Sequence, residues 1–351
     1  REYDAKSREY LLTVEQTCPP TPRQPDKEAF YIPLTLALLD SNGQELPLQL
    51  QGETSAVSSR VLAITEARQQ FRFINIPEEP VPSLLRGFSA PVKLTCDYSR
   101  EELMFLISHD ADGFVRWEAC QQLALQVIYD GLAARQQGSA FEVDPRLVTA
   151  YRNVLEHSLE NPEFDKAMVA NLLLLPSEAY ISELMTVIDP DAIHQTREHL
   201  RHYLARVLAT ELGEVYHANT ESGPYVYAAE PVARRSLKNT VLNYLMTLES
   251  PHWYAIARNQ YDQANNMTDA SAVLRAFINN PCPANLEIRH ELIDSFYQQW
   301  KHETLVVEQW LSMQSAAPVA DNLERIKALI QHEAFDLRNP NKVRCVIGAF
   351  C

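Results

Sequence analysis

The chain has 351 residues, of which 46% are hydrophobic and 22% are charged, and its formal net charge at pH 7 is −15. This length is too great for one compact core and favours two or three domains. The acidic balance argues against nucleic acid as a partner, because phosphate backbones require a basic face. No run of about 18 apolar residues occurs, so no membrane-spanning helix is expected.

The chain before Tyr98 consists of short segments in which apolar and polar residues alternate, the pattern of half-buried β-strands. Asn42-Gly43 stands between two apolar segments and predicts a tight hairpin turn. We therefore predict a small immunoglobulin-like β-sandwich over residues 1–98. The predicted strands are residues 9–16, 31–38, 46–50, 61–65, 71–76 and 92–98.

Helical periodicity begins at Ser99 and continues to the end of the chain. Ser99 and Glu102 form the pattern of a capping box, in which each side chain accepts from a backbone amide of the first turn. A second helix follows Gly113, and later helices start at proline or capping residues. Those starts lie near residues 144, 161, 177, 189, 231, 251, 268, 283 and 322.

The helical starts recur without a strict sequence repeat, which excludes a consensus tetratricopeptide or ankyrin array. We predict instead that residues 99–351 form an irregular helical superhelix of the armadillo or HEAT type. Such an array needs a polar capping element at its end, whereas this chain stops on an apolar, helix-like segment. We therefore expect the superhelix to be truncated at its C-terminus.

Six cysteines are scattered along the chain, and none forms a Cys-x-x-Cys pair. Their spacing argues against a disulfide framework or a zinc ribbon and is typical of a reducing compartment. We therefore expect a cytoplasmic protein. The chain opens at Arg1 within a polar segment, so we also expect part of the natural N-terminus to be missing.

Three His-Glu pairs invite comparison with zinc peptidases. They are His290-Glu291, His302-Glu303 and His332-Glu333. The zinc site of those enzymes needs a second histidine four residues after the first, so that both imidazoles face one metal. The three corresponding positions hold Asp294, Val306 and Asp336. No pair is complete, so we predict neither a metal site nor a catalytic residue in this chain.

Two further patterns are better explained without a metal. His194, His199 and His202 lie opposite the predicted apolar stripe of their helix, which indicates a solvated face. The segment from Asp110 to Gly113 resembles part of a calcium-binding loop, but Ala119 stands where that loop requires glutamate. We expect a turn between two helices at that segment.

Four stretches of the chain resemble one protein family, in the family's order. They are PSLLRGFSAPVKL at residues 82–94, LATEL with YHAN within residues 208–219, ANNMTD at residues 264–269, and NPNKVR running into IGAF at residues 339–350. Together they resemble the C-terminal half of bacterial aminopeptidase N, the zinc-dependent alanyl aminopeptidase. The likeness spans essentially the whole chain.

The resemblance implies a larger enzyme, in which a thermolysin-like domain holds zinc and a zinc-activated water attacks the N-terminal peptide bond. The HExxH and GxMEN motifs of that family are absent from this chain. The chain would thus carry only the sandwich and the superhelix and hold no cofactor of its own. Arg344 matches an arginine that the family directs toward the active-site cavity, where it would contact the peptide's far carboxylate or backbone.

The resemblance therefore predicts a non-catalytic part that caps the active site and admits only small peptides. Its partner would be the catalytic domain of the same polypeptide. A free-standing superhelix that grips a peptide or protein in its groove is the alternative. An independent enzyme that uses Asp294 or Asp336 in a metal site is a third hypothesis.

Overall fold

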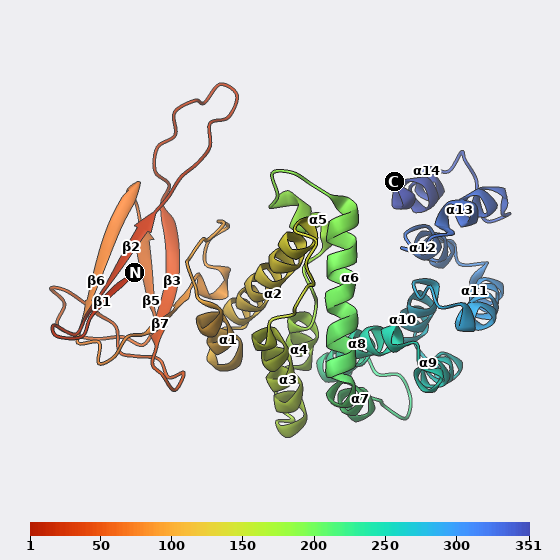
Figure 1. The fold of residues 1–351 in the computed structure, drawn as a ribbon, viewed down its shortest axis with the longest axis horizontal. Helices are drawn as coiled ribbons and strands as arrows, with labels where there is room; N and C mark the ends of the chain where they lie inside the picture. The colour runs from red at the N-terminus through yellow and green to blue at the C-terminus, as the bar shows by residue number, and fades with distance from the viewer. The chain divides into compact units, whose positions relative to one another are not determined.

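The structure is a computed structural model that describes all 351 residues. The chain divides into two compact units. The first comprises Arg1–Val154 and Asn171–Arg197, and the second comprises Leu155–Ala170 and Glu198–Cys351. All strands belong to the first unit and are coloured red to orange in Figure 1.

Seven strands form two antiparallel sheets. They are β1 (Glu2–Asp4), β2 (Glu9–Glu15), β3 (Ile32–Leu39), β4 (Gln49–Leu50), β5 (Arg60–Ile64), β6 (Arg68–Ile74) and β7 (Val81–Leu84). The four-stranded sheet has the order β1-β2-β6-β4, and the three-stranded sheet has the order β5-β3-β7. The two sheets share one apolar core, which confirms the predicted β-sandwich.

The core of the sandwich follows from the alternation of residues along its strands. On β3, Leu36 and Leu38 are fully buried, and in the other sheet Phe73 of β6 is fully buried as well. Tyr10 of β2 stands directly opposite Phe73, with the two ring centroids 6.4 Å apart. Pairs of this kind fix the strand register, because a slip by one residue would expose the whole apolar face.

The last strand of the sandwich is not the predicted one. Residues 92–98 form no strand, although Val92, Leu94 and Cys96 pack against the sandwich core as their alternation suggested. The alternation reflects burial on one side rather than pairing of the backbone. The three-stranded sheet is instead completed by β7, which the sequence did not predict because Pro82 interrupts its alternation. Proline is tolerated there because β7 is an edge strand, whose outer side needs no backbone donor.

The predicted turn at Asn42-Gly43 exists, but the hairpin does not continue. The amide of Gly43 donates to the carbonyl of Asp40 at 3.0 Å, and Gly43 has a φ of +80°. The returning chain pairs with β3 only through the bridge between Leu39 and Glu45 and the hydrogen bond from Leu46 to Leu38. β4 then pairs with β6 in the other sheet. The predicted strand 46–50 is therefore reduced to two residues, Gln49–Leu50.

The remaining chain is helical, with fourteen α-helices. They are α1 (Arg100–His109), α2 (Gly113–Gln136), α3 (Pro145–Glu160), α4 (Lys166–Leu172), α5 (Glu178–Glu183), α6 (Pro190–Val207), α7 (Ala209–Ala218), α8 (Ala229–Leu245), α9 (Pro251–Gln263), α10 (Met267–Ile278), α11 (Leu286–Trp300), α12 (Thr304–Ser315), α13 (Asn322–Gln331) and α14 (Pro340–Val343). Short turns η1 (Arg86–Phe88), η2 (Met246–Leu248), η3 (Pro283–Asn285) and η4 (Arg344–Gly348) flank them.

Most helices begin where the sequence predicted. The Ser99 hydroxyl accepts from the Glu102 amide, and the Glu102 carboxylate accepts from the Ser99 amide, so the capping box is complete. Asp112 caps α2 by accepting from the Val115 amide, which confirms that residues 110–113 form a turn between helices. The sequence analysis missed α7 and α12, which have no capping side chain at their starts.

A buried ion-pair network joins the sandwich to the first helices within the first unit. Arg86, which follows β7, pairs with Glu45 at 2.7 Å and with Asp110 at 3.3 Å, while the Gly87 amide donates to Asp112. Burial raises the pKa of Asp110, although Arg86 opposes that shift. The strands and α1 therefore form a continuous body.

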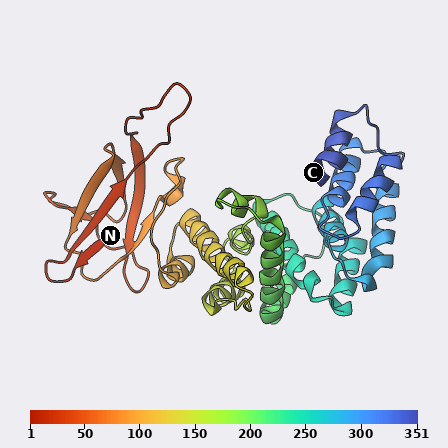
Figure 2. The ribbon, with the colours of Figure 1, turned by 45° about the horizontal axis from the view of Figure 1, so that its top comes forward.

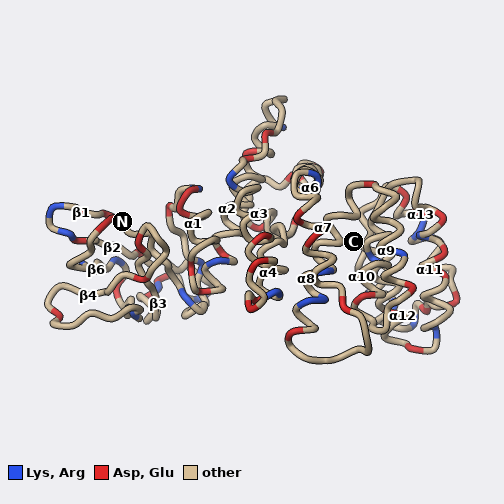
Figure 3. The backbone as a smooth tube through the Cα atoms, turned by 90° about the horizontal axis from the view of Figure 1, so that it is seen from below, with Lys and Arg blue, Asp and Glu red and all other residues tan.

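In the second unit, helices that are consecutive in the chain pack against one another: α7 on α8, α9 on α10, α10 on α11, α11 on α12, and α12 on α13. Figure 2 shows the helices of the C-terminal end, in blue, standing side by side. Figure 3 shows acidic residues spread along these helices with basic residues between them, rather than a basic face. This stacking of helices confirms the predicted superhelical class.

Candidate functional site

The second unit contains a cavity of about 470 Å³ between α10, α12 and the turn η4. Its lining combines charged, amide, hydroxyl and sulfur side chains: Arg275, Asn279, Glu308, Gln309, Ser312, Met313, Ala316 and Cys345. One cation and one carboxylate line a hollow that is otherwise of mixed polar and apolar character, so the cavity can pair with ligand groups of either charge.

The lining follows from how α12 divides its two faces. Val307, Trp310 and Leu311 are at most 5% exposed and pack into the helical core. The 3.6-residue period therefore directs Glu308 and Ser312 to the cavity side. The sequence analysis missed these residues, because α12 carries no start signal and its half-buried polar face resembles any solvated helix face.

The cavity offers no activated nucleophile. Cys345 is its only thiol, and burial, followed by the charge of Glu308, raises the pKa of that thiol. A protonated thiol is a poor nucleophile. The arrangement is therefore suited to binding rather than to covalent chemistry.

Arg344 adjoins this cavity in the chain, one residue before Cys345. Asn339 caps α14 by accepting from the amides of Asn341 and Lys342, and Pro340 occupies the first turn. The helix thus begins at Pro340, and it continues through η4, a π-helical turn that starts at Arg344. The Arg344 side chain is exposed and forms no hydrogen bond or ion pair within the chain. Its role toward a peptide stays a prediction.

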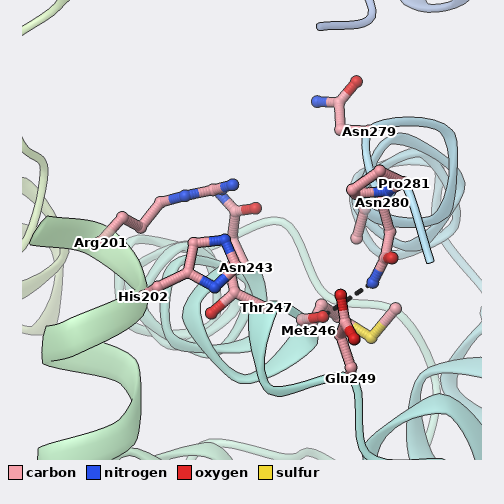
Figure 4. Close-up of a pocket in the computed structure, with 10 residues that line it drawn as sticks. Arg201, His202, Asn243, Met246, Thr247, Glu249, Asn279, Asn280 and Pro281 are labelled. Atoms are coloured by element: carbon pink, nitrogen blue, oxygen red, sulfur yellow. Dashed lines mark hydrogen bonds between the residues drawn. The ribbon is translucent and has the colours of Figure 1, made fainter. Parts of the chain in front are cut away.

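A second and smaller hollow, of about 20 Å³, lies between α6, η2 and the end of α10. Figure 4 shows Arg201 and His202 on α6 facing the η2 region, with Asn279 and Asn280 on the opposite side. Asn280 donates to the carbonyl of Met246 at 2.8 Å, which fixes that side. Asn279 lines both hollows, so the two adjoin at the end of α10.

His202 lines the smaller hollow together with the charged side chains of Arg201 and Glu249. Burial, followed by the charge of Arg201, lowers the pKa of His202, against the opposing charges of Glu198 and Glu249. The imidazole is therefore neutral at physiological pH and can accept as well as donate a hydrogen bond. The volume suffices for about one water molecule, so this hollow is too small for a substrate by itself.

The structure separates the three His-Glu pairs of the sequence analysis. Only His290-Glu291 lies inside a helix, α11, where Glu291 pairs with Arg258 at 2.8 Å. Glu303 stands immediately before α12 and its side chain caps nothing, so the second pair lies at a helix end. His332 ends α13 and packs its ring on Tyr297, with centroids 4.7 Å apart. Neither His302-Glu303 nor His332-Glu333 therefore lies on a continuous helical face that could hold a metal.

The helix α6 carries its histidines as predicted. Ile193, Leu200 and Leu204 are buried at 1% exposure or less, while His199 and His202 are exposed. His194 contacts Glu178 at 2.8 Å. No three His, Cys, Asp or Glu side chains of the chain come together in a way that could hold a metal ion.

None of the helices combines the length and the apolar character needed to cross a membrane.

Two family profiles cover the chain. Residues 100–351 match DUF3458_C, described as a domain of unknown function with ARM repeats. Residues 1–97 match DUF3458, described as a domain of unknown function with an Ig-like fold.

Curated relatives share the name aminopeptidase N. The Escherichia coli (strain K12) protein is 38% identical over 349 residues, which are 99% of this chain and 39% of that protein. The Haemophilus influenzae protein is 36% identical over 348 residues, again 99% of this chain and 38% of that protein. The chain therefore spans about two fifths of the length of the curated relatives it matches.

A solved structure agrees with these relatives. The crystal structure of Legionella pneumophila aminopeptidase A in complex with aspartic acid superposes with a TM-score of 0.82 at 27% sequence identity. The match covers 99% of this chain and 38% of that chain.

Proposed function

The chain belongs to the DUF3458_C family and is homologous to the C-terminal part of bacterial aminopeptidase N, and from this we propose that it serves as the cap of a zinc aminopeptidase. The cap covers an active site held by another part of the same protein and limits access to small peptides. The observation that carries the proposal is coverage: 99% of the chain aligns with only 39% of an aminopeptidase N.

The side chains of this chain do not fit the family's zinc. His290, His302 and His332 lack a second histidine four residues on, and the chain has no cluster of three donors. We propose that the peptide-bond cleavage takes place entirely on the catalytic part. What this chain supplies is a polar surface around the larger cavity, with Arg275 and Glu308 as its charged groups.

Arg344 is the residue that we propose for contact with the peptide. Its guanidinium is exposed, has no partner within the chain, and adjoins the cavity residue Cys345. A guanidinium without an internal carboxylate is free to bind the carboxylate at the far end of a short peptide through two parallel hydrogen bonds.

The Arg344→Gln variant tests this contact in the protein that includes the catalytic part. We expect KM for an alanyl tripeptide with a free C-terminal carboxylate to rise about tenfold, since that corresponds to one lost charge-assisted contact. The KM for the same tripeptide as an amide, and the turnover of an alanyl anilide, should stay unchanged.

Arg338→Gln is the matched control, because Arg338 lies six residues upstream and its side chain is 90% exposed and paired with Asp336. It should leave all three substrates unaffected. Equal changes for the acid and the amide in Arg344→Gln, or the same change in Arg338→Gln, would contradict the assignment.

We further propose that the sandwich ends at Tyr98 and the superhelix begins at Ser99. Cys96 still packs on the sandwich core, whereas the capping box of Ser99 starts α1.

The six cysteines are all free. This supports our proposal of a reducing, cytoplasmic location.

A further inference from the structure

A buried polar cluster lies between the start of α11, the start of α13 and the loop before α11. Its charged members are Arg289 of α11 and, at the start of α13, Arg325 and Asp321, whose charges act on Arg289. Asn285 and Asn322 stand at the starts of the same two helices. Asn285 is completely buried and Arg289 is only 5% exposed. The cluster contains two guanidinium groups and a single carboxylate, an unusual composition for a protein interior.

The two guanidinium charges of the cluster are opposed by one carboxylate, that of Asp321. Arg325 donates from Nε to Asp321 at 3.1 Å, and Arg289 donates from one terminal nitrogen to the carbonyl of Asn280 at 3.3 Å. No ion pair is formed by Arg289. Burial lowers the pKa of Arg289, the neighbouring charge of Arg325 lowers it further, and Asp321 opposes both.

Several donors of the cluster have no acceptor within the protein. These enclosed nitrogens are Nε of Arg289, both terminal nitrogens of Arg325, and Nδ2 of Asn285. The side-chain oxygens of Asn285 and Asn322 are likewise enclosed without a donor, so the donors outnumber the acceptors by four to two. Asn285 precedes Arg289 by four residues, so the two side chains lie on the same side of the helix start. Enclosed donors are normally paired, because an unmet donor loses its hydrogen bond to water without replacement.

Two other buried cations of the same unit show how the protein balances such groups elsewhere. Arg235 and Lys238 are each 5% exposed, as Arg289 is. Arg235 pairs with Glu221 at 3.2 Å and Lys238 pairs with Asp269 at 2.9 Å. The cluster around Arg289 and Arg325 is thus an exception within this unit.

We propose that Arg289 and Arg325, with Asn285, bind a small inorganic anion such as chloride or phosphate. An anion between the two guanidinium groups supplies the missing negative charge and accepts from the enclosed donors. The cluster lies close to the surface at the start of α13, where the Arg325 side chain is 15% exposed and that of Asp321 is 60% exposed. The anion would act as a structural tie between α11 and α13.

Thermal unfolding of the whole chain tests the proposal, in sodium chloride, sodium phosphate and sodium gluconate at equal ionic strength. Gluconate is the reference, because it is too bulky for an enclosed site. We expect Tm in chloride or phosphate to exceed that in gluconate by about 2 °C, as binding to the folded state alone predicts for a chain of this length at tenfold excess over Kd. Chloride and phosphate in separate arms identify which anion is bound.

The variant Arg325→Gln removes one guanidinium and, with it, the repulsion of Arg289. We expect it to unfold at the same or a higher temperature than the unaltered chain in gluconate, and to lose the rise in chloride and phosphate. Arg338→Gln is the control and should keep the rise, since its side chain is exposed and remote in sequence from the cluster. A rise that survives in Arg325→Gln would overturn the proposal, as would equal Tm values in all three salts.

Anomalous diffraction from crystals soaked in sodium bromide gives a second readout that needs no variant. A bromide peak between Arg289 and Arg325 is expected. Ordered water in its place, or bromide only at other positions, would refute the anion site.

Discussion

Cys120 illustrates how burial decides the chemistry of a single residue. The side chain is 1% exposed on α2, and its sulfur donates to the carbonyl of Leu172 at 3.1 Å. Burial raises its pKa to about 12. The thiolate, which is the reactive form, is therefore scarce at any pH at which the protein is handled.

We predict that Cys120 resists alkylation in the folded protein. A pulse of iodoacetamide at pH 8, followed by peptide mass spectrometry, should label the exposed Cys351 and leave Cys120 unlabelled. In denaturant both should react. Labelling of Cys120 at the rate of Cys351 under native conditions would show that α2 is not packed as described.

The same residue-level reasoning applies to His332. The sequence offered it as a possible metal ligand, whereas its ring packs against both Tyr297 and Trp310, with centroids 4.7 and 5.2 Å away. The dipeptide pattern does not specify that α13 ends at this residue. Sequence spacing predicts a shared face only where a helix continues, and here it does not.

At the scale of the elements, Gly131 of α2 allows Thr196 of α6 and Phe141 to approach the α2 backbone closely. A Cβ at Gly131 would lie 2.5 Å from the Thr196 methyl and 2.9 Å from the Phe141 ring. Thr196 is 1% exposed and cannot move into solvent. The absence of a side chain at this position therefore permits the contact.

We predict that Gly131→Ala destabilises the protein. Overpacking costs about 1–3 kcal/mol, while the better helix propensity of alanine returns up to about 1 kcal/mol. The net loss should appear as a lower midpoint in urea unfolding followed by circular dichroism.

Gly213→Ala on α7 is the matched control, because its Cβ would lie 3.2 Å from Trp253, a less severe contact. Its midpoint should change less than that of Gly131→Ala. A midpoint for Gly131→Ala equal to or above that of the unaltered chain would mean that Thr196 and Phe141 can shift at little cost.

The whole molecule is built as a sandwich followed by stacked helices, and no cluster of metal-binding side chains is found in it. This supports the proposal that catalysis depends on another part of the protein. The polar hollows of the second unit are open to a ligand but contain no activated nucleophile.

We predict that the chain by itself is inactive. After incubation with zinc and dialysis, inductively coupled plasma mass spectrometry should find well below one zinc ion per chain. Hydrolysis of an alanyl anilide should not exceed that of a sample treated with a chelator. Escherichia coli aminopeptidase N serves as the positive control in both assays. One zinc per chain together with hydrolysis would refute the cap proposal and favour the third hypothesis.

Much of the secondary structure of this protein is determined by the local sequence alone. Ser99, Asp112 and Asn339 fix helix starts through their own side chains. The alternation at Leu34, Leu36 and Leu38 gives the face of β3 that meets the sandwich core, although Ala37 and Leu39 on the other face are buried too. Both features depend on neighbours within a few residues, which the sequence displays directly.

Tertiary structure decided the rest. Residues 92–98 alternate like a strand but find no pairing partner, whereas β7 forms despite Pro82 because the open edge of β3 accepts it. The cavity around Glu308 and the cluster around Arg289 bring together residues from separate helices. Such neighbours are set by packing between distant segments, and no local pattern in the chain encodes the distance between them.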